Sequence, residues 1–266
     1  MVSIRKPAVA DAFYPGNPVE LRQMIDKFLN DAKDVKINGK LRALVVPHAG
    51  YIYSGPVAAY GYKLLSKHPE RFTKIILVGP SHFAAFPGAA ESGADGWQTP
   101  LGIVNSGSLN EGKKEKDIFR TIPEVHAPEH NLEVQLPFLQ CVMKSDFTIY
   151  PILAGEVSPS ALAQAIAGIL DDKTLVIASS DLSHYNPYER AVKLDSLCNK
   201  AVPALDIKTM EESGDACGKT AILTLMNLAK KKKWKGKLLD YRNSGDTAGP
   251  KDSVVGYGCY AFYSPK

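Results

Sequence analysis

Three histidines follow predicted β-strands, and their side chains are the groups in this 266-residue chain best suited to chemistry. They are His48, His82 and His184, and each comes just after a short apolar, β-branched run: 41–46, 74–78 and 174–178. Parallel strands end at one edge of a sheet, where open α/β folds bind ligands, so we expect the three to converge. Imidazole is both a common metal ligand and a general acid or base near neutral pH. A lone histidine after a strand can equally cap a turn, but three in equivalent positions favour a shared site.

Cys217 is the cysteine whose surroundings are most favourable for reactivity. The stretch 214–219 is expected to open a helix that runs to Lys232, and a helix N-terminus with Lys219 nearby favours thiolate over thiol. A metal ligand or nucleophile and an inert thiol are both open interpretations. The other three cysteines, Cys141, Cys198 and Cys259, are expected to pack in the core. None of the four cysteines forms a CxxC pair, which argues against a zinc ribbon or a disulfide framework.

A second polar group surrounds the sequence Ala-Pro-Glu at 127–129. Glu129 and Glu133 are predicted to share one face of a helix, so that Glu129, His130 and Glu133 would form a polar cluster at the edge of the site. An exposed N-terminal helical turn explains the two acidic residues equally well.

The elements that must position these residues alternate between strands and helices. Strands are predicted at 41–46, 74–78, 147–153, 174–178, 237–241 and 254–263. Helices are predicted at 160–170 and from 217 to 232, with a charged, exposed helix at 111–116. This order indicates an α/β fold with a mostly parallel central sheet and helices on both faces. Without a long linker or repeat, residues 1–266 are interpreted as a single domain.

The composition excludes several classes of protein. A net charge of +4 is too weak for a dedicated nucleic-acid binder, and 45% hydrophobic residues exclude a disordered chain. The longest apolar runs are far shorter than the ~18 to 20 residues that a bilayer requires, so no membrane association is expected. No apolar segment follows the first charged residues, which predicts a cytoplasmic protein.

Several motifs, spread over nearly the whole chain and in the right order, closely resemble the Memo family. They are Ala12-Phe13-Tyr14-Pro15, Pro47-His48-Ala49-Gly50-Tyr51, Gly79-Pro80-Ser81-His82, Glu129-His130-Asn131-Leu132-Glu133, Ser179-Ser180-Asp181 with His184, and Cys217-Gly218. Prokaryotic members of that family are called AmmeMemoRadiSam system protein B. The family's fold resembles that of the class III extradiol (LigB-type) dioxygenases, which implies a dioxygenase-like fold here.

The resemblance also implies a site. In the family two histidines and a cysteine form a metal-binding pocket, and those positions match His48, His82 and Cys217. Asp181 and His184 match residues that line the same pocket. We expect His184 to act as acid or base, and Asp181 to orient it or to hydrogen-bond a water on the metal. Further substrate contacts are expected from residues beside these loops: Tyr51, Tyr53, Tyr185, Glu129 and His130.

The leading hypothesis for function is a metal-dependent redox or oxygenase-like enzyme that uses iron or copper. A thiolate ligand in place of a carboxylate makes catechol cleavage a poor expectation, because it shifts preference toward copper and zinc. The competing hypothesis is a non-catalytic module that binds a peptide, a small molecule or a protein partner. A zinc hydrolase is a third hypothesis. The prokaryotic family name implies an AMMECR-type protein and a radical SAM protein as partners.

Overall fold

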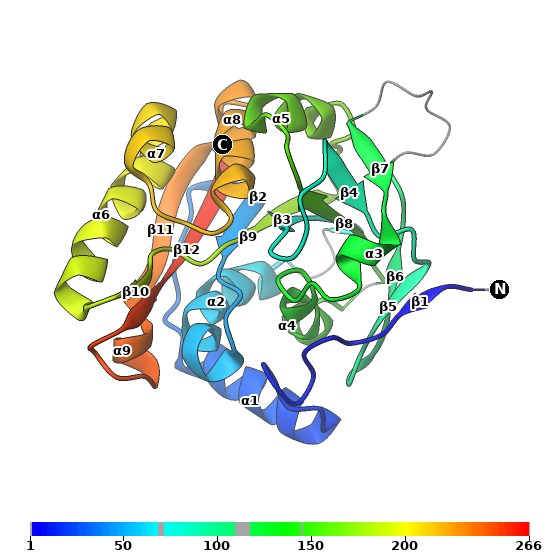
Figure 1. Ribbon diagram of the computed structural model, residues 1–266, viewed down its shortest axis with the longest axis horizontal. Coiled ribbons are helices and arrows are strands. Elements are labelled where there is room, and N and C mark those ends of the chain that lie inside the picture. Colours follow the sequence, from blue (N-terminus) through cyan, green and yellow to red (C-terminus); the bar gives the residue numbers. More distant parts are fainter. Residues whose placement is uncertain (1, 69–71, 110–117, 145, 266) are drawn as a thin grey trace.

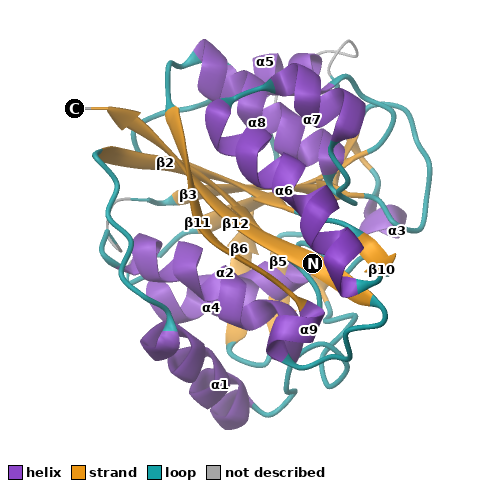
Figure 2. Cartoon of the chain, turned by 90° about the vertical axis from the view of Figure 1, so that its left-hand side faces the viewer, coloured by secondary structure: helices purple, strands orange, loops and turns teal. Residues whose placement is uncertain are grey.

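The fold is a large twisted sheet between two layers of helices. In the computed structural model, which describes residues 2–68, 72–109, 118–144 and 146–265, the helices α5 to α8 cover one face of the sheet (Figure 1). Figure 2 shows the sheet nearly edge-on, with α1, α2, α4 and α9 on the other face. Each face buries its own hydrophobic cluster. Burial of apolar side chains on both faces is what holds the layers together.

The described residues form the following elements. The helices are α1 Pro18–Asp31, α2 Tyr51–Ser66, α3 Pro123–His126, α4 Leu136–Val142, α5 Pro159–Ala167, α6 Tyr188–Ala204, α7 Ile207–Ser213, α8 Lys219–Lys231 and α9 Ser244–Thr247, with a 3₁₀ turn at Glu133–Gln135. The strands are β1 Ile4–Arg5, β2 Gly39–Val46, β3 Lys74–Pro80, β4 Ala89–Glu91, β5 Gly96–Thr99, β6 Gly102–Ser106, β7 Phe119–Thr121, β8 Thr148–Ala154, β9 Thr174–Ser179, β10 His184–Asn186, β11 Lys235–Asn243 and β12 Val254–Pro265.

The centre of the sheet is parallel. Strands β8, β3, β9 and β2 lie side by side and run in the same direction, with Ile76 level with Val176 and Ala43 level with Val176. Their burial explains their sequences, since parallel strands covered on both faces are apolar at nearly every position. This part confirms the α/β fold with helices on both faces that the sequence predicts.

Both ends of the sheet contain antiparallel pairs. On one side β12 pairs antiparallel with β2, β10 and β11, and on the other β5 pairs antiparallel with β6. The sheet is therefore mixed outside its centre. Strands β5 and β6 follow each other directly in the chain, and an antiparallel pair needs only such a tight connection, whereas each parallel crossover needs a dozen or more residues.

The six predicted strands are all confirmed, within three residues at either end. The predicted helices correspond to α5 and α8, although α8 begins at Lys219 rather than at Cys217. The helix expected at 111–116 lies outside the described residues, and the single-domain interpretation of residues 1–266 stays a prediction. Among the residues that the structure describes, no helix has both the length and the apolar character that spanning a bilayer demands.

Candidate metal centre

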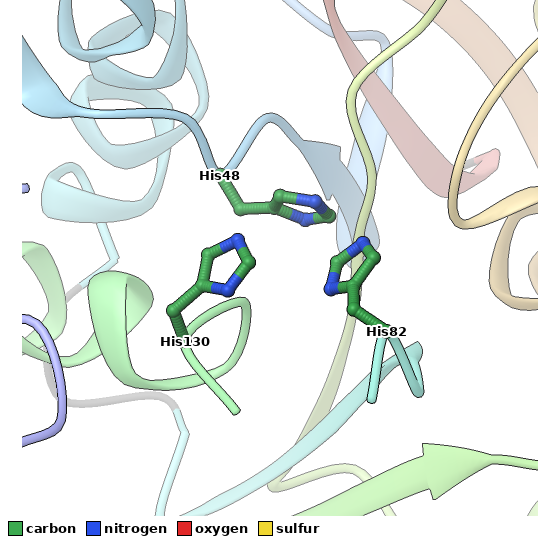
Figure 3. Close-up of side chains that lie close together, drawn as sticks. All are labelled: His48, His82 and His130. Atoms are coloured by element: carbon green, nitrogen blue, oxygen red, sulfur yellow. The ribbon is translucent and has the colours of Figure 1, made fainter. Parts of the chain in front are cut away.

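Three imidazole rings converge at the carboxyl edge of the sheet (Figure 3). His48 follows β2, His82 follows β3, and His130 lies in the turn that precedes the 3₁₀ segment. One ring nitrogen of each lies within 4.8 Å of the other two. The ring centroids of His48 and His82 are 5.3 Å apart, and those of His82 and His130 are 4.9 Å apart in a stacked pair. This group can hold a metal ion.

The Glu129 carboxylate orients two of these rings. Its Oε1 lies 2.9 Å from His82 Nδ1 and 3.2 Å from His130 Nδ1, and Oε2 accepts the backbone N–H of His82 at 2.7 Å. Burial alone would raise the pKa of Glu129, but hydrogen bonds from His82 and the charges of His82 and His130 outweigh it and lower the pKa to about 2. An ionised carboxylate only accepts hydrogen bonds, so Nδ1 of His82 carries the proton. Nε2 of His82 is then free to ligate, as in carboxylate–histidine–metal arrangements.

The His48 and His130 rings are neutral near pH 7. Burial, together with the charges of His130 and His82, lowers the pKa of His48 well below its usual value. Burial also lowers the pKa of His130, against the opposing charge of Glu129. Neutral imidazole is the form that binds metals. Because His48 is only 2% exposed while the His82 side chain is 27% exposed, the group opens to solvent on the His82 side.

Cys217 is partly exposed and lies beside the buried His48 ring. Its Sγ is 3.2 Å from His48 Nε2 and 3.7 Å from the carbonyl oxygen of Asp181. Gly218 makes this close approach to the end of β9 possible, since a Cβ at that position would lie 2.6 Å from the carbonyl oxygen of Ser179. The structure thus brings Cys217 beside His48, although the group of three ligating atoms within 4.8 Å consists of histidines.

The expectation of a thiolate at Cys217 is wrong for the metal-free protein. Burial, reinforced by the negative charge of Asp181, raises the pKa of Cys217 to about 12. Hydrogen bonds with the Asp181 backbone, the Ser180 side chain and the Gly218 backbone lower this pKa, but burial outweighs them. Cys217 precedes the helix, whose N-cap is Gly218, so it lies outside the first turn. Only a bound cation would favour the thiolate here.

Asp181 and His184 lie beside the three histidines, in the loop after β9 and at the start of β10. The Asp181 carboxylate accepts the backbone N–H of His48 at 2.7 Å and so holds the His48 loop in place. Burial raises the pKa of Asp181 to about 6, against hydrogen bonds from the His48 and Ala49 backbone and the charge of His184. His184 is partly exposed, and its charge lowers the pKa of His48. Both side chains therefore act electrostatically on the same site.

The three tyrosines expected near the substrate have different environments. Tyr51 is 2% exposed in the core, where its hydroxyl donates to the carbonyl oxygen of Val134 at 2.6 Å. Tyr53 is partly buried against the same core. Tyr185 is 78% exposed, with its ring 5.7 Å from that of His184 and a φ of 58°. A positive φ is unusual for a bulky residue, and it projects this ring into solvent beside His184.

Glu133 does not share a helical face with Glu129, so that prediction is wrong. Glu129 lies in a turn, and the helical segment begins only at Glu133. The reason is local: Glu129 Oε1 accepts the backbone N–H groups of His130 and Asn131, and such side-chain bonds compete with helix formation. Glu133 instead binds the Arg5 guanidinium at 2.7 Å.

The role of His130 was the least well predicted from the sequence. It was expected as a substrate contact at the edge of the site, but its ring belongs to the group of three. The signal in the sequence was its place directly after Glu129, whose carboxylate is shared by both neighbouring imidazoles. Periodicity gave no sign of it, because residues 129 and 130 lie in a loop that belongs to no helix or strand.

Comparisons with known proteins agree with the motifs. A family model described as "Memo-like protein" matches residues 5–261. A protein of Nitrosopumilus maritimus (strain SCM1) named "MEMO1 family protein" is 36% identical, over 97% of this chain and 99% of that protein. A Sulfolobus acidocaldarius protein with the same name is 38% identical, over 96% of this chain and 97% of that protein. A solved structure of an uncharacterized Escherichia coli K12 protein covers 82% of this chain and 99% of its own, with 11% identity and a TM-score of 0.47.

Proposed function

The chain belongs to the Memo family, and from that premise we propose that it is a metal-dependent redox or oxygenase-like enzyme that uses iron or copper. The observation that carries the proposal is the convergence of His48, His82 and His130, with ring nitrogens within 4.8 Å of one another. Imidazole is a common metal ligand, and three rings that approach one point at a partly open edge of the sheet form a suitable metal site.

The donor set fits a transition metal. Imidazole nitrogen suits iron, copper and zinc, and the Cys217 sulfur beside His48 adds a softer donor that favours copper or zinc. Two ligand sets are therefore candidates. The family resemblance implies His48, His82 and Cys217, and the geometry favours His48, His82 and His130, so both sets contain His48 and His82. When bound, a redox metal would supply electron transfer, and zinc would supply only Lewis acidity.

The surrounding residues would do the remaining work. Glu129 holds the His82 ring by its Nδ1 proton and stabilises positive charge at the site. His184 would transfer a proton to or from the substrate on the exposed side. Asp181 holds the His48 loop in place, because its carboxylate accepts the backbone N–H of His48. Tyr185, exposed next to His184, would contact the substrate.

We further propose, from the prokaryotic family name, that the protein works with an AMMECR-type protein and a radical SAM protein. Co-purification with the radical SAM protein encoded in the same genome would test this. The metal proposal does not depend on it.

The experiment is metal loading followed by a measurement of turnover. The purified protein would be reconstituted anaerobically with Fe(II), Cu(I) or Zn(II), and bound metal would be counted by elemental analysis, with oxygen consumption recorded for the redox metals. His48→Ala, His82→Ala and His130→Ala should each abolish stoichiometric binding, whereas His68→Ala, at an exposed position, should retain it. Cys217→Ala should weaken binding if sulfur ligates. His184→Ala should bind metal normally but lose turnover.

Each alternative predicts a distinct outcome. Equal metal content in the wild type and all histidine variants would disprove the site. Binding that depends on the histidines, without oxygen consumption under any condition, would favour the non-catalytic binding module. Ester or amide hydrolysis by the zinc form alone would favour the hydrolase.

A further inference from the structure

A chain of buried polar groups ends on the inner nitrogen of His48. The Tyr62 hydroxyl donates to Gln135 Oε1 at 2.7 Å, and Gln135 Nε2 donates to Ser179 Oγ at 2.8 Å. Ser179 Oγ lies 3.0 Å from His48 Nδ1. Gln135 and Ser179 are both buried, and neither belongs to the ligating group. We refer to Tyr62, Gln135 and Ser179 as the relay.

The direction of each hydrogen bond in the relay is determined by groups that can only accept. Gln135 Nε2 also lies 3.0 Å from the carbonyl oxygen of Pro47, so the amide nitrogen must face this side and the amide oxygen must face Tyr62. Ser179 Oγ lies 2.7 Å from the carbonyl oxygen of Asn131, which accepts the single hydroxyl proton. A hydroxyl oxygen has two lone pairs in addition to its proton. One accepts from Gln135, and the other remains for His48.

His48 therefore has to donate to Ser179 from Nδ1. If the hydroxyl proton turned toward His48 instead, two acceptor oxygens would face each other at 2.7 Å in the core without a proton between them. A buried acceptor left without a donor is strongly unfavourable, because it has lost its hydrogen bonds to water and gained none in the protein. With the proton on Nδ1, the lone pair of the neutral ring is on Nε2, which points toward Cys217 Sγ at 3.2 Å.

We propose that Ser179, held in place by Gln135, is a positioning residue that selects the Nδ1–H tautomer of His48 and so presents its Nε2 lone pair to a metal. The metal part of this inference rests on the proposed function, whereas the tautomer exists in the metal-free protein. The other tautomer would direct an N–H at the ion and exclude His48 as a ligand.

The relay is the neutral counterpart of Glu129. Glu129 holds the Nδ1 proton of His82 with a carboxylate, on the side of the site where the histidine side chain is 27% exposed. His48 is 2% exposed, and a second carboxylate there would add an uncompensated buried charge. A hydroxyl oriented by an amide performs the same task without that charge.

The test is ¹⁵N NMR of protein labelled selectively in histidine, in which the two ring nitrogens of each tautomer give distinct shifts. Metal-free wild type should show His48 as Nδ1–H. Ser179→Ala should lose that pattern and bind Zn(II) about 10- to 100-fold more weakly, the effect typical of removing a group that orients a ligand. Ser179→Thr, which keeps the hydroxyl, should restore both. Ser54→Ala is the matched control, because it removes another buried hydroxyl, which donates to the carbonyl oxygen of Ala49.

The wild-type spectrum alone can overturn the inference, even if a variant fails to fold. An Nε2–H pattern for His48 in the metal-free protein would disprove it, as would Ser179→Ala protein that keeps the Nδ1–H pattern. If wild type shows the expected tautomer but binds no metal, the proposed function fails and the tautomer assignment stands.

Discussion

Glu129 and Glu133 lie four residues apart, both buried, yet they serve different parts of the molecule. Glu129 faces the titratable rings of His82 and His130 at the metal centre. Glu133 faces the permanent cation of Arg5 and also accepts from the Tyr14 hydroxyl at 2.6 Å and from two backbone N–H groups. The first carboxylate orients possible ligands, and the second ties the N-terminal segment to the 3₁₀ segment at Glu133–Gln135.

The two carboxylates have different roles because their basic partners differ: arginine for Glu133 and histidine for Glu129. Arginine stays charged at any pH that the protein meets, so a buried Arg–Glu pair is a fixed structural element. Imidazole changes its charge near neutrality and can exchange a proton for a metal. The Arg5 guanidinium also lies 4.1 Å above the Trp97 ring, which fixes it further. The role of a buried carboxylate therefore follows from the type of basic side chain that it contacts.

Removal of Arg5 should have the largest effect. Arg5→Met would leave the Glu133 carboxylate buried without its cation, and breaking a buried pair in this way costs about 3–5 kcal/mol of stability. Urea unfolding would measure it. The double variant Arg5→Met/Glu133→Gln should recover part of the loss, since no unpaired charge remains and the amide oxygen can still accept from Tyr14 or the backbone. A double variant as unstable as the single one would show that the pair itself is not the cause.

The next largest effect is a pH dependence of stability that comes from His126. Burial, opposed by a hydrogen bond to Ala90 and reinforced by the charge of Arg5, lowers the pKa of His126 to about 4. The unfolded chain, with a pKa near 6.5, therefore binds more protons between these values. Stability should fall by about 2–3 kcal/mol as the pH drops from 6.5 to 4, at about 1.4 kcal/mol per unit.

His126→Gln would isolate this contribution, because glutamine can still donate to the carbonyl oxygen of Ala90, which lies 2.9 Å from His126 Nε2. Denaturant unfolding at several pH values should show a shallower loss in the variant. Parallel curves for the two proteins would mean that other groups cause the acid sensitivity.

Neutralising the two carboxylates should affect metal binding unequally. Glu129→Gln would present an N–H to the His82 or His130 ring and should weaken Zn(II) binding about 10- to 100-fold. Glu133→Gln, the matched control, should leave the affinity of the folded protein unchanged while it lowers stability. Calorimetric titration with Zn(II) measures both. If both variants lost the same affinity for Zn(II), Glu129 would not be the carboxylate that specifically orients the metal ligands.

An exposed ion pair should show the smallest effect. Lys74 and Asp171 lie 2.8 Å apart, closely similar to Arg5 and Glu133, but their side chains are 45% and 44% exposed. Asp171→Asn should cost less than about 1 kcal/mol, because water screens the pair. If Asp171→Asn lowered the free energy of unfolding as much as Arg5→Met does, burial would not be what determines the contribution of an ion pair to stability.

The strands and the convergence of loops at the sheet edge followed from sequence patterns. Each central strand is a short β-branched run, and short buried runs have few other stable arrangements in an α/β chain. His48 and His82 were placed correctly beside each other because strand order and direction alone decide which loops meet. The positions of His130 and of Tyr51 could not be predicted this way, because a turn and a helix start have no periodicity that tells which way a side chain points.

By itself, the sequence determined the α/β fold, the family and the strand ends that carry His48 and His82, since these depend on local apolar patterns and on motifs in a linear order. Only the tertiary structure decided which carboxylate faces the histidines, that burial protonates the Cys217 thiol, and that Ser179 accepts from His48. The physical reason is that protonation and hydrogen-bond direction depend on the groups within a few ångströms in space, and those groups come from distant parts of the chain.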